Sequence, residues 1–342
     1  MAVLFGTYMA RMITYESRPL EKTLARVENG FYKMVGIDKD QQMSWKEYLL
    51  ALVVTNAIVA GFVFVMLMAQ GLLPVSQGLD GFSPDLAFHT AASFITNTNL
   101  QHYAGDQQLS VFSQMTVITF IMFVAPASGI AAAFAFIRAF IRKNFGLGNF
   151  YVDFIRVIVT LLLPVAFVSA LLLVFLGVPQ TLAPSATVGT LEGDQQTMVM
   201  GPVASLESIK QLGSNGGGYF SANSAHPFEN PSGLSSMFET LLMLVIPLSF
   251  PIAFAKLVGK GRGVSILIAM LAGFGVMLGI ALVQESGPAL LETRFGSFGS
   301  VLFNVGSLST NTGAVASSLA GMSPSAVTGL FLGMFVQAIP GA

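Results

Sequence analysis

The sequence predicts an all-α polytopic membrane protein built from a repeated unit of helix, short helix, polar turn and helix. Three observations support this fold class. The 342-residue chain has long apolar runs, its basic residues fall in alternate connections between those runs, and a polar cluster of similar composition recurs three times.

Apolar runs long enough to cross a bilayer dominate the chain. It is 54% hydrophobic and 10% charged, with a mean hydropathy of +0.72, and about 20 apolar residues suffice to span the hydrocarbon core as a helix. The N-terminus lacks the short apolar core of a cleavable signal peptide. The absence of cysteine excludes disulfides, thiolate catalysis and zinc–thiolate sites. The predicted spans are 49–73, 111–137, 157–178, 235–258, 263–284 and 324–342.

The basic residues indicate which connections face the cytoplasm. The net charge is only −1, but fourteen of the sixteen Lys and Arg lie in 1–50, 138–156 and 256–262. The positive-inside rule places these segments in the cytoplasm and predicts that the connections 74–110, 179–234 and 285–323 face outward. A solvated basic face for nucleic acid does not predict such alternation, so no nucleic-acid partner is expected.

The outward connections each contain a weakly apolar segment of helical composition that ends in a polar cluster. The regions 83–110, 205–223 and 297–315 have this pattern. The order of span, short helix, polar turn and span recurs roughly every 100 residues, which predicts an internal repeat. Aligned on asparagine, the clusters are Thr96-Asn97-Thr98-Asn99, Ser214-Asn215-Gly216-Gly217 and Thr310-Asn311-Thr312-Gly313.

This composition suits re-entrant loops that bind a monovalent cation. Short helices cannot cross a bilayer, and non-helical backbone is tolerated at membrane depth only where protein shields it or it lines water. Rings of backbone carbonyl oxygens can replace the hydration shell of such an ion. Ordinary surface turns are the alternative for any one cluster taken alone. A phosphate cradle at 216–218 is disfavoured, because no Walker lysine follows and no strand precedes it.

Four stretches resemble the KdpA family, the potassium-binding subunits of the Kdp potassium-transporting P-type ATPase. "GPVASLESIKQLGSNGGGYFSANSAHPFENP" (201–231) is similar to a signature stretch of that family, and 8–52 resembles its first cytoplasmic segment. "FHTAASFITNTNLQHYAGDQQLS" (88–110) resembles its first pore loop, and 292–315 its third. The similarity covers almost the whole chain in the family's order. The family belongs to the Trk/Ktr/HKT superfamily, whose four pore-loop repeats surround one pathway on a pseudo-fourfold axis.

The resemblance implies a potassium selectivity filter at the three clusters. In the family these loops select potassium, which then moves to a separate ATP-hydrolysing subunit. The implied filter residues are Thr96, Asn97 and Thr98, then Asn215, Gly216 and Gly217, then Asn311, Thr312 and Gly313; Asn99, Gln101, Ser214, Gly218 and Thr310 support them.

The implied function is therefore high-affinity, ATP-driven potassium uptake at the inner cell membrane by a non-catalytic subunit. The potassium ion is the bound species, and ATP is used by a partner alone. Expected partners are a KdpB-like catalytic subunit, a KdpC-like accessory subunit, a KdpF-like single-span peptide and lipids. The chain has no Walker motif and no Asp-Lys-Thr-Gly phosphorylation signature. A stand-alone potassium channel or cation-coupled transporter of the same superfamily is the alternative.

The sequence also departs from the family pattern. Leu100 stands where an aromatic residue is usual, Asn311-Thr312-Gly313 where Ser-Cys-Gly is common, and Gln337 where an acid is expected. The resemblance implies that these 342 residues correspond to a truncated version of the family's chain, without its first membrane helix and its fourth repeat. The expected divisions are a cytoplasmic segment 1–48, first repeat 49–137, cytoplasmic loop 138–156, second repeat 157–258 and incomplete third repeat 263–342.

Two further polar residues attract attention. Glu239 lies near one end of a predicted span, where it should face a neighbouring helix, vestibule water or the ion pathway, because a charge in hydrocarbon is costly. His226 lies among turn residues, and with no second His or Cys nearby it is expected to be a hydrogen-bonded loop residue rather than a metal ligand. An enzyme using His226 and Glu229 is disfavoured, since no nucleophile, base and orienting group occur together.

Overall fold

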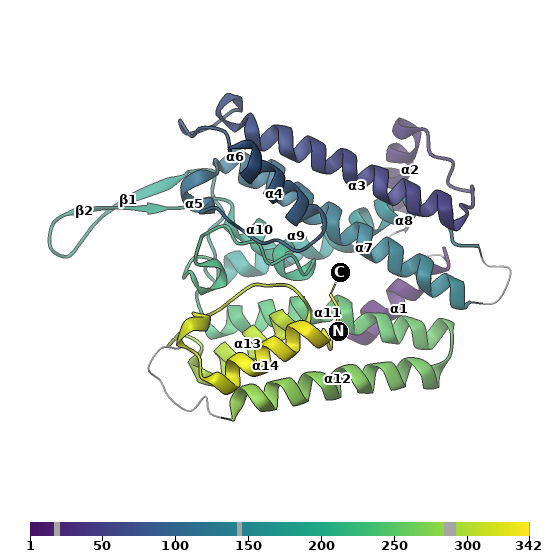
Figure 1. The fold of residues 1–342 in the computed structure, drawn as a ribbon. Helices are drawn as coiled ribbons and strands as arrows, with labels where there is room; N and C mark the ends of the chain where they lie inside the picture. Colours follow the sequence, from purple (N-terminus) through teal and green to yellow (C-terminus); the bar gives the residue numbers. More distant parts are fainter. Residues whose placement is uncertain (17–20, 142–145, 284–291, 342) are drawn as a thin grey trace.

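The computed structural model describes residues 1–16, 21–141, 146–283 and 292–341, and within them helices predominate (Figure 1). The basic residues Arg18, Arg142 and Lys143, used above to predict orientation, lie outside the described residues. The same holds for position 284, at the end of one predicted span, and for 285–291 of the last outward connection.

Among the residues that the structure describes, five helices are long and apolar enough to cross a membrane by length and composition. They confirm five of the six predicted spans. Two of these helices pass through a π-helical turn without a break. The spans are α3 (Trp45–Met68); Val111–Phe140, which comprises α6 (Val111–Ser113), η2 (Gln114–Ile118) and α7 (Thr119–Phe140); Phe150–Phe175, which comprises α8 (Phe150–Arg156), η3 (Val157–Leu162) and α9 (Leu163–Phe175); α11 (Gly233–Leu257); and α12 (Lys260–Leu282).

The sixth predicted span, 324–342, is shorter than expected. Helix α14 (Pro324–Val336) has 13 residues and ends where Gln337 adopts a left-handed conformation with φ of 44°. The amide of Ile339 then donates to the carbonyl of Ser309 (3.2 Å). The chain therefore turns toward the polar cluster near 310 instead of continuing as a helix, a change that apolar composition alone does not reveal.

Three short helices occupy the predicted positions between the spans: α4 (Pro84–Ile95), α10 (Val203–Leu212) and α13 (Gly296–Ser309). Proline at the first turn of α4 fits the helix start, because its missing N–H is not needed there. Helix α4 packs on α3 and α7, α10 on α9, α11 and α7, and α13 on α11, α12 and α14. The short helices are thus packed among several other helices, and α10 is the most deeply buried of the three.

Two N-terminal helices precede this arrangement. Helix α1 (Ala2–Ile13) packs along α11, and Met9, Met12 and Ile13 on it are fully buried. This packing was not predicted. Helix α2 (Glu21–Val35) contacts α8 and the π-helical turn that follows it.

The sequence prediction of a purely α-helical chain missed one hairpin. Strands β1 (Ser185–Gly189) and β2 (Gln195–Val199) pair antiparallel, with Ser185 opposite Val199. Their residues are largely exposed, so no alternation of buried and exposed positions marked them as strands. Figure 1 shows the hairpin projecting at one end of the helices, while the α11–α12 connection lies at the other.

Helix α7 extends past the predicted loop boundary at 138, and Arg138 in its last turn is buried. Its guanidinium forms a two-point ion pair with Asp153 of α8, with Nη1–Oδ2 of 2.5 Å and Nη2–Oδ1 of 2.7 Å. Nε also donates to the carbonyl of Ile13 (2.7 Å). The pair therefore ties α1, α7 and α8 together at the end of the bundle where the basic connections lie.

Candidate functional site

The short helices α4, α10 and α13 end in the same backbone turn. After α4, the amide of Asn97 donates to the carbonyl of Phe94 (3.1 Å), and that of Thr98 to Ser93 (2.9 Å). This pair of bonds is the Schellman motif, which satisfies carbonyls at a helix C-terminus. After α10, the amide of Ser214 donates to the carbonyl of Gln211 (3.2 Å), and that of Asn215 to the carbonyl of Lys210 (2.8 Å). After α13, the amide of Asn311 donates to the carbonyl of Leu308 (3.2 Å), and that of Thr312 to the carbonyl of Ser307 (2.8 Å).

Backbone torsions give the register of the three turns and correct the alignment on asparagine. Asn97, Ser214 and Asn311 each follow the helix cap with φ of 58°, 51° and 56°. Asn97 therefore corresponds to Ser214, and the second turn is Gly213-Ser214-Asn215-Gly216. Composition could not fix this register, because the position of the turn depends on where α10 ends. Positive φ recurs two residues later, at Asn99 (50°), Gly216 (84°) and Gly313 (83°).

Side-chain amides connect the first turn to the second. Asn97 Nδ2 donates to the carbonyl of Gly213 (3.0 Å), and Asn99 Nδ2 donates to that of Asn215. Gln101 makes two bonds with Gly218: its Nε2 donates to the carbonyl (2.9 Å), and its Oε1 accepts from the amide (2.8 Å). Two segments about a hundred positions apart in the chain thus lie in direct contact.

The second turn also touches the third. A Cβ added at Gly216 would overlap the carbonyl oxygen of Thr312, so only glycine permits this approach. Thr310 and Thr312 hydroxyls lie 2.7 Å apart, as those of Thr96 and Thr98 lie 2.9 Å apart. The chain after α14 returns here too, since a Cβ on Gly341 would meet the carbonyl of Thr310 and the side chain of Ser214.

The structure thus brings together most of the residues singled out from the sequence. Gly217 packs against Phe94 of α4 and Met122 of α7. Positions 213–218 are all buried, whereas Thr96, Thr98, Asn311 and Gly313 are exposed. The carbonyls of Asn215 and Gly216 already accept a side-chain bond each, the second from Asn223 Nδ2 (2.6 Å). A carbonyl oxygen has two lone pairs and keeps capacity for a further partner.

Sequence reasoning missed the charged residues behind the second turn. Glu207, Lys210 and Glu229 are fully buried, and Lys210 Nζ lies 2.8 Å from Glu207 Oε2 and 2.5 Å from Glu229 Oε2. Burial and the nearby Glu207 charge act to raise the pKa of Glu229, whereas the Lys210 ammonium group beside it opposes the shift. One signal was available: Lys210 is one of two basic residues in the connections predicted to face outward, in a chain with few charges.

Glu239 and His226 have the surroundings of structural residues. Glu239 is fully buried, and its Oε2 accepts from Gln211 Nε2 of α10 (3.3 Å), so it faces a neighbouring helix. His226 stacks on Phe220 at 3.8 Å, and its Nδ1 accepts from the amide of Phe228 (3.1 Å). Burial lowers the pKa of His226. No cluster of three or more potential metal-ligating His, Asp or Glu occurs in the described part of the chain.

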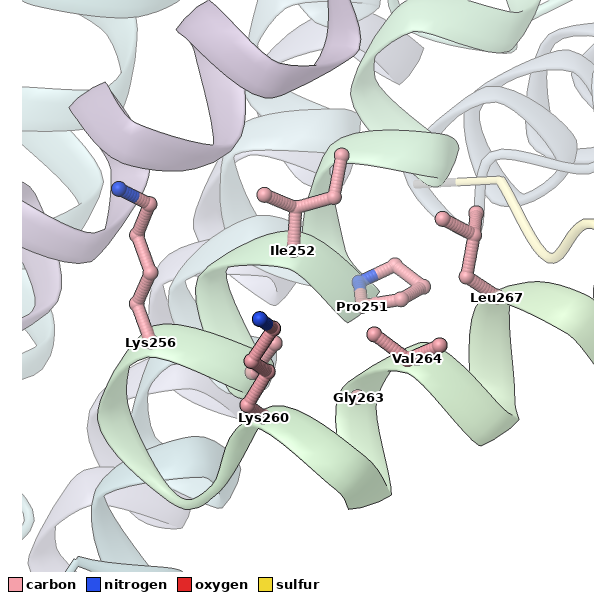
Figure 2. Close-up of a pocket in the computed structure, with 8 residues that line it drawn as sticks. Pro251, Ile252, Lys256, Lys260, Gly263, Val264 and Leu267 are labelled. Carbon is pink, nitrogen blue, oxygen red and sulfur yellow. The ribbon is translucent and has the colours of Figure 1, made fainter.

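A pocket of about 400 Å³ lies between α11 and α12, apart from the three turns (Figure 2). Lys256 and Lys260 border it beside Pro251 and Ile252, close to the connection between these helices. Apolar walls and two ammonium groups disfavour a cation, so the pocket is not a candidate potassium site.

A bundle with five helices able to cross a membrane, in which three polar turns meet, defines a multi-pass membrane protein with an internal polar site. The family model described as "Potassium-transporting ATPase A subunit" matches residues 1–342, and the chain belongs to this family, KdpA.

Two curated relatives have the name "Potassium-transporting ATPase potassium-binding subunit". The protein from Caldanaerobacter subterraneus subsp. tengcongensis is 42% identical over 86% of this chain and 53% of its own length. The protein from a Hydrogenobaculum species is 44% identical over 94% of this chain and 60% of its own length. The chain therefore spans between half and about three fifths of these relatives.

Proposed function

We propose that this chain binds potassium ions from the outside at its three turns and passes them to a separate ATP-hydrolysing subunit. It belongs in this proposal to a Kdp-type potassium-uptake complex, as a non-catalytic subunit of the inner cell membrane. A KdpB-like subunit uses ATP, and KdpC-like and KdpF-like subunits complete the assembly. Both curated relatives are named as potassium-binding subunits, which supports this assignment.

The contact among the three turns is the observation on which the proposal depends. A potassium filter requires backbone oxygens from several segments within a few ångströms of one another. Asn97, Asn99 and Gln101 join the first turn to the second, and Gly216 lies against Thr312 of the third. Neither surface turns nor a phosphate cradle would need such approach of segments remote in sequence.

The recurring helix order supports a repeat around a shared axis. In this proposal α4, α10 and α13 are pore helices of the repeats 49–137, 157–258 and 263–342. The turns that follow them act as selectivity loops open to the outside. Segments 1–48 and 138–156 face the cytoplasm, in agreement with the positive-inside rule. The α11–α12 connection, with Lys256 and Lys260, lies at the same end as these segments (Figure 1).

The test uses the full-length gene product, purified with the subunits that accompany it. We expect ATP hydrolysis to rise with potassium and to be insensitive to sodium. Gly216→Ala should raise the half-saturating potassium concentration about 100-fold, because a left-handed residue with a side chain costs about 1–3 kcal/mol and the added methyl displaces Thr312.

Gly275→Ala is the matched control, since a Cβ at that helical position meets nothing within 4 Å. It should leave the potassium dependence unchanged. A rate of ATP hydrolysis that does not depend on potassium in the unmodified complex would refute the proposal. Potassium flux through the purified protein without ATP would favour a channel or cation-coupled transporter instead.

A further inference from the structure

The backbone around the second turn is attached to the buried ion pair behind it. Lys210 Nζ has three acceptors, Glu207 Oε2 (2.8 Å), Glu229 Oε2 (2.5 Å) and Ser224 Oγ (2.7 Å). These use all three donors of an ammonium group. The four side chains are fully buried, so their positions are fixed by one another and not by solvent.

The same residues hold the backbone on both sides of Asn215–Gly218. On the near side, the carbonyl of Lys210 accepts from the amide of Asn215 (2.8 Å). On the far side, Glu229 Oε1 accepts from the amide of Phe220 (2.7 Å). A Cβ at Gly218 would also meet Glu229 Oε1 at 3.0 Å, so this carboxylate lies directly against the turn.

Ser224 extends this connection to a carbonyl of the turn itself. Its hydroxyl accepts from Lys210, and its amide donates to Asn223 Oδ1 (2.8 Å). Asn223 Nδ2 in turn donates to the carbonyl of Gly216 (2.6 Å). A shift of the ion pair would therefore move Gly216. The close contact of this glycine with Thr312 brings the second and third turns together.

Stability alone does not account for an ion pair at this position. Replacing buried ion pairs with well-packed apolar residues is often neutral or stabilising, because desolvation offsets the attraction between the charges. What the pair provides here is a directed contact: Glu229, held by Lys210, accepts a hydrogen bond from the amide of Phe220. An apolar pair could fill the space but would leave the amide of Phe220 without this acceptor.

We propose that the Lys210–Glu229 ion pair positions the second turn and thereby sets the discrimination of potassium from sodium. This inference rests on the proposed function of the turns. Potassium and sodium differ in size, so a turn that relaxes by a fraction of an ångström coordinates both ions more equally. Glu229 acts through the backbone and need not contact the ion.

Glu229→Gln tests this in the full-length protein with its accompanying subunits. The amide retains an oxygen for Phe220 but presents an NH₂ group or a neutral oxygen to Lys210. We expect the half-saturating potassium concentration, read from thermal stabilisation by potassium chloride, to rise about tenfold. Sodium chloride should become a better stabiliser relative to potassium, a change that mere loss of stability would not produce. Asp153→Asn is the matched control, because Asp153 belongs to the buried ion pair away from the turns.

The outcomes are distinguishable. Unchanged potassium preference in folded Glu229→Gln, or an equal loss of preference in Asp153→Asn, would overturn the positioning inference. If Glu229→Gln does not fold, Ser224→Ala tests the inference instead. We expect the preference for potassium over sodium to fall about threefold, because this variant removes a single neutral hydrogen-bonding group. No change in that variant would overturn the inference as well. No potassium preference in the unmodified protein would instead refute the proposed function.

Discussion

Two buried ion pairs in this protein have similar chemistry and different surroundings. Lys210–Glu229 lies behind the second turn, and Arg138–Asp153 lies where α7 and α8 meet; the side chains of both pairs are fully buried. Around Arg138 the partners are the ends of helices and the carbonyls of Ile13 and Leu147. Around Lys210 the partners lead to the amide of Phe220 and, through Ser224 and Asn223, to the carbonyl of Gly216 in the second turn. The comparison teaches that a buried charge can serve stability or site geometry, according to the backbone it holds.

Tyrosines complete the Arg138–Asp153 pair and mark a second difference. The Tyr15 hydroxyl donates to Asp153 Oδ1 (3.0 Å), and that of Tyr48 donates to the carbonyl of Ala131 (2.7 Å) and lies 3.0 Å from Asp153 Oδ2. Burial and the Asp153 charge raise the pKa of Tyr15 to about 12, so it stays protonated and remains a donor at neutral pH. Asp153 thus accepts from both Arg138 and Tyr15, whereas Glu229 shares Lys210 with Glu207.

The largest effect expected in this comparison is on stability. Arg138→Met leaves the Asp153 charge buried without its counter-charge, which should reduce the free energy of unfolding by roughly 3–5 kcal/mol. Thermal unfolding of the purified protein, compared with Arg262→Met at an exposed position, measures this loss. The half-saturating potassium concentration of the surviving folded fraction should not change. A shift comparable to that of Glu229→Gln would show that the two ion pairs do not differ in role.

The next largest effect is expected on potassium affinity, from the two uncharged hydrogen bonds between Gln101 and Gly218. Gln101→Leu removes both bonds to Gly218, and at about 1 kcal/mol each the potassium affinity should fall about thirtyfold. Gln70→Leu is the matched control: Gln70 is buried, and its amide donates to the carbonyls of Asp80 (2.6 Å) and Gln108 (2.7 Å), outside the turns.

The control should lose at least as much thermal stability as Gln101→Leu, because its amide is more deeply buried. It should keep its potassium titration. If both variants lose affinity equally, the amide contacts between the first two turns contribute only to general packing of the connections 74–110 and 179–234.

Hydropathy and residue type along the chain predicted the helices. The geometry of the candidate site, in contrast, depends on contacts between residues far apart in the sequence. Hydropathy located the five long helices, and the proline at 84 with the apolar pattern after it located α4. The polar composition of the turns was also visible. Their register was not, because α10 continues to Leu212 and moves the left-handed residue to Ser214. The sequence also did not show that Glu229 pairs with Lys210. Glu229 lies 19 residues further along the chain and reaches Lys210 only because the intervening loop folds back.

The smallest effect expected concerns one hydroxyl at the Arg138–Asp153 pair. Tyr48→Phe removes the donor to Ala131 and leaves the ion pair in place, so the free energy of unfolding should fall by about 1 kcal/mol. Potassium affinity should be unchanged, as measured by the same titration. The carbonyl of Ala131 lies within a helix and retains its main-chain donor, which limits the loss. Tyr151→Phe, at a half-buried ring beside Phe150, is the control with a smaller expected effect. A loss in Tyr48→Phe as large as that in Arg138→Met would mean that the tyrosine, rather than the ion pair, holds α3 and α7 together at this end.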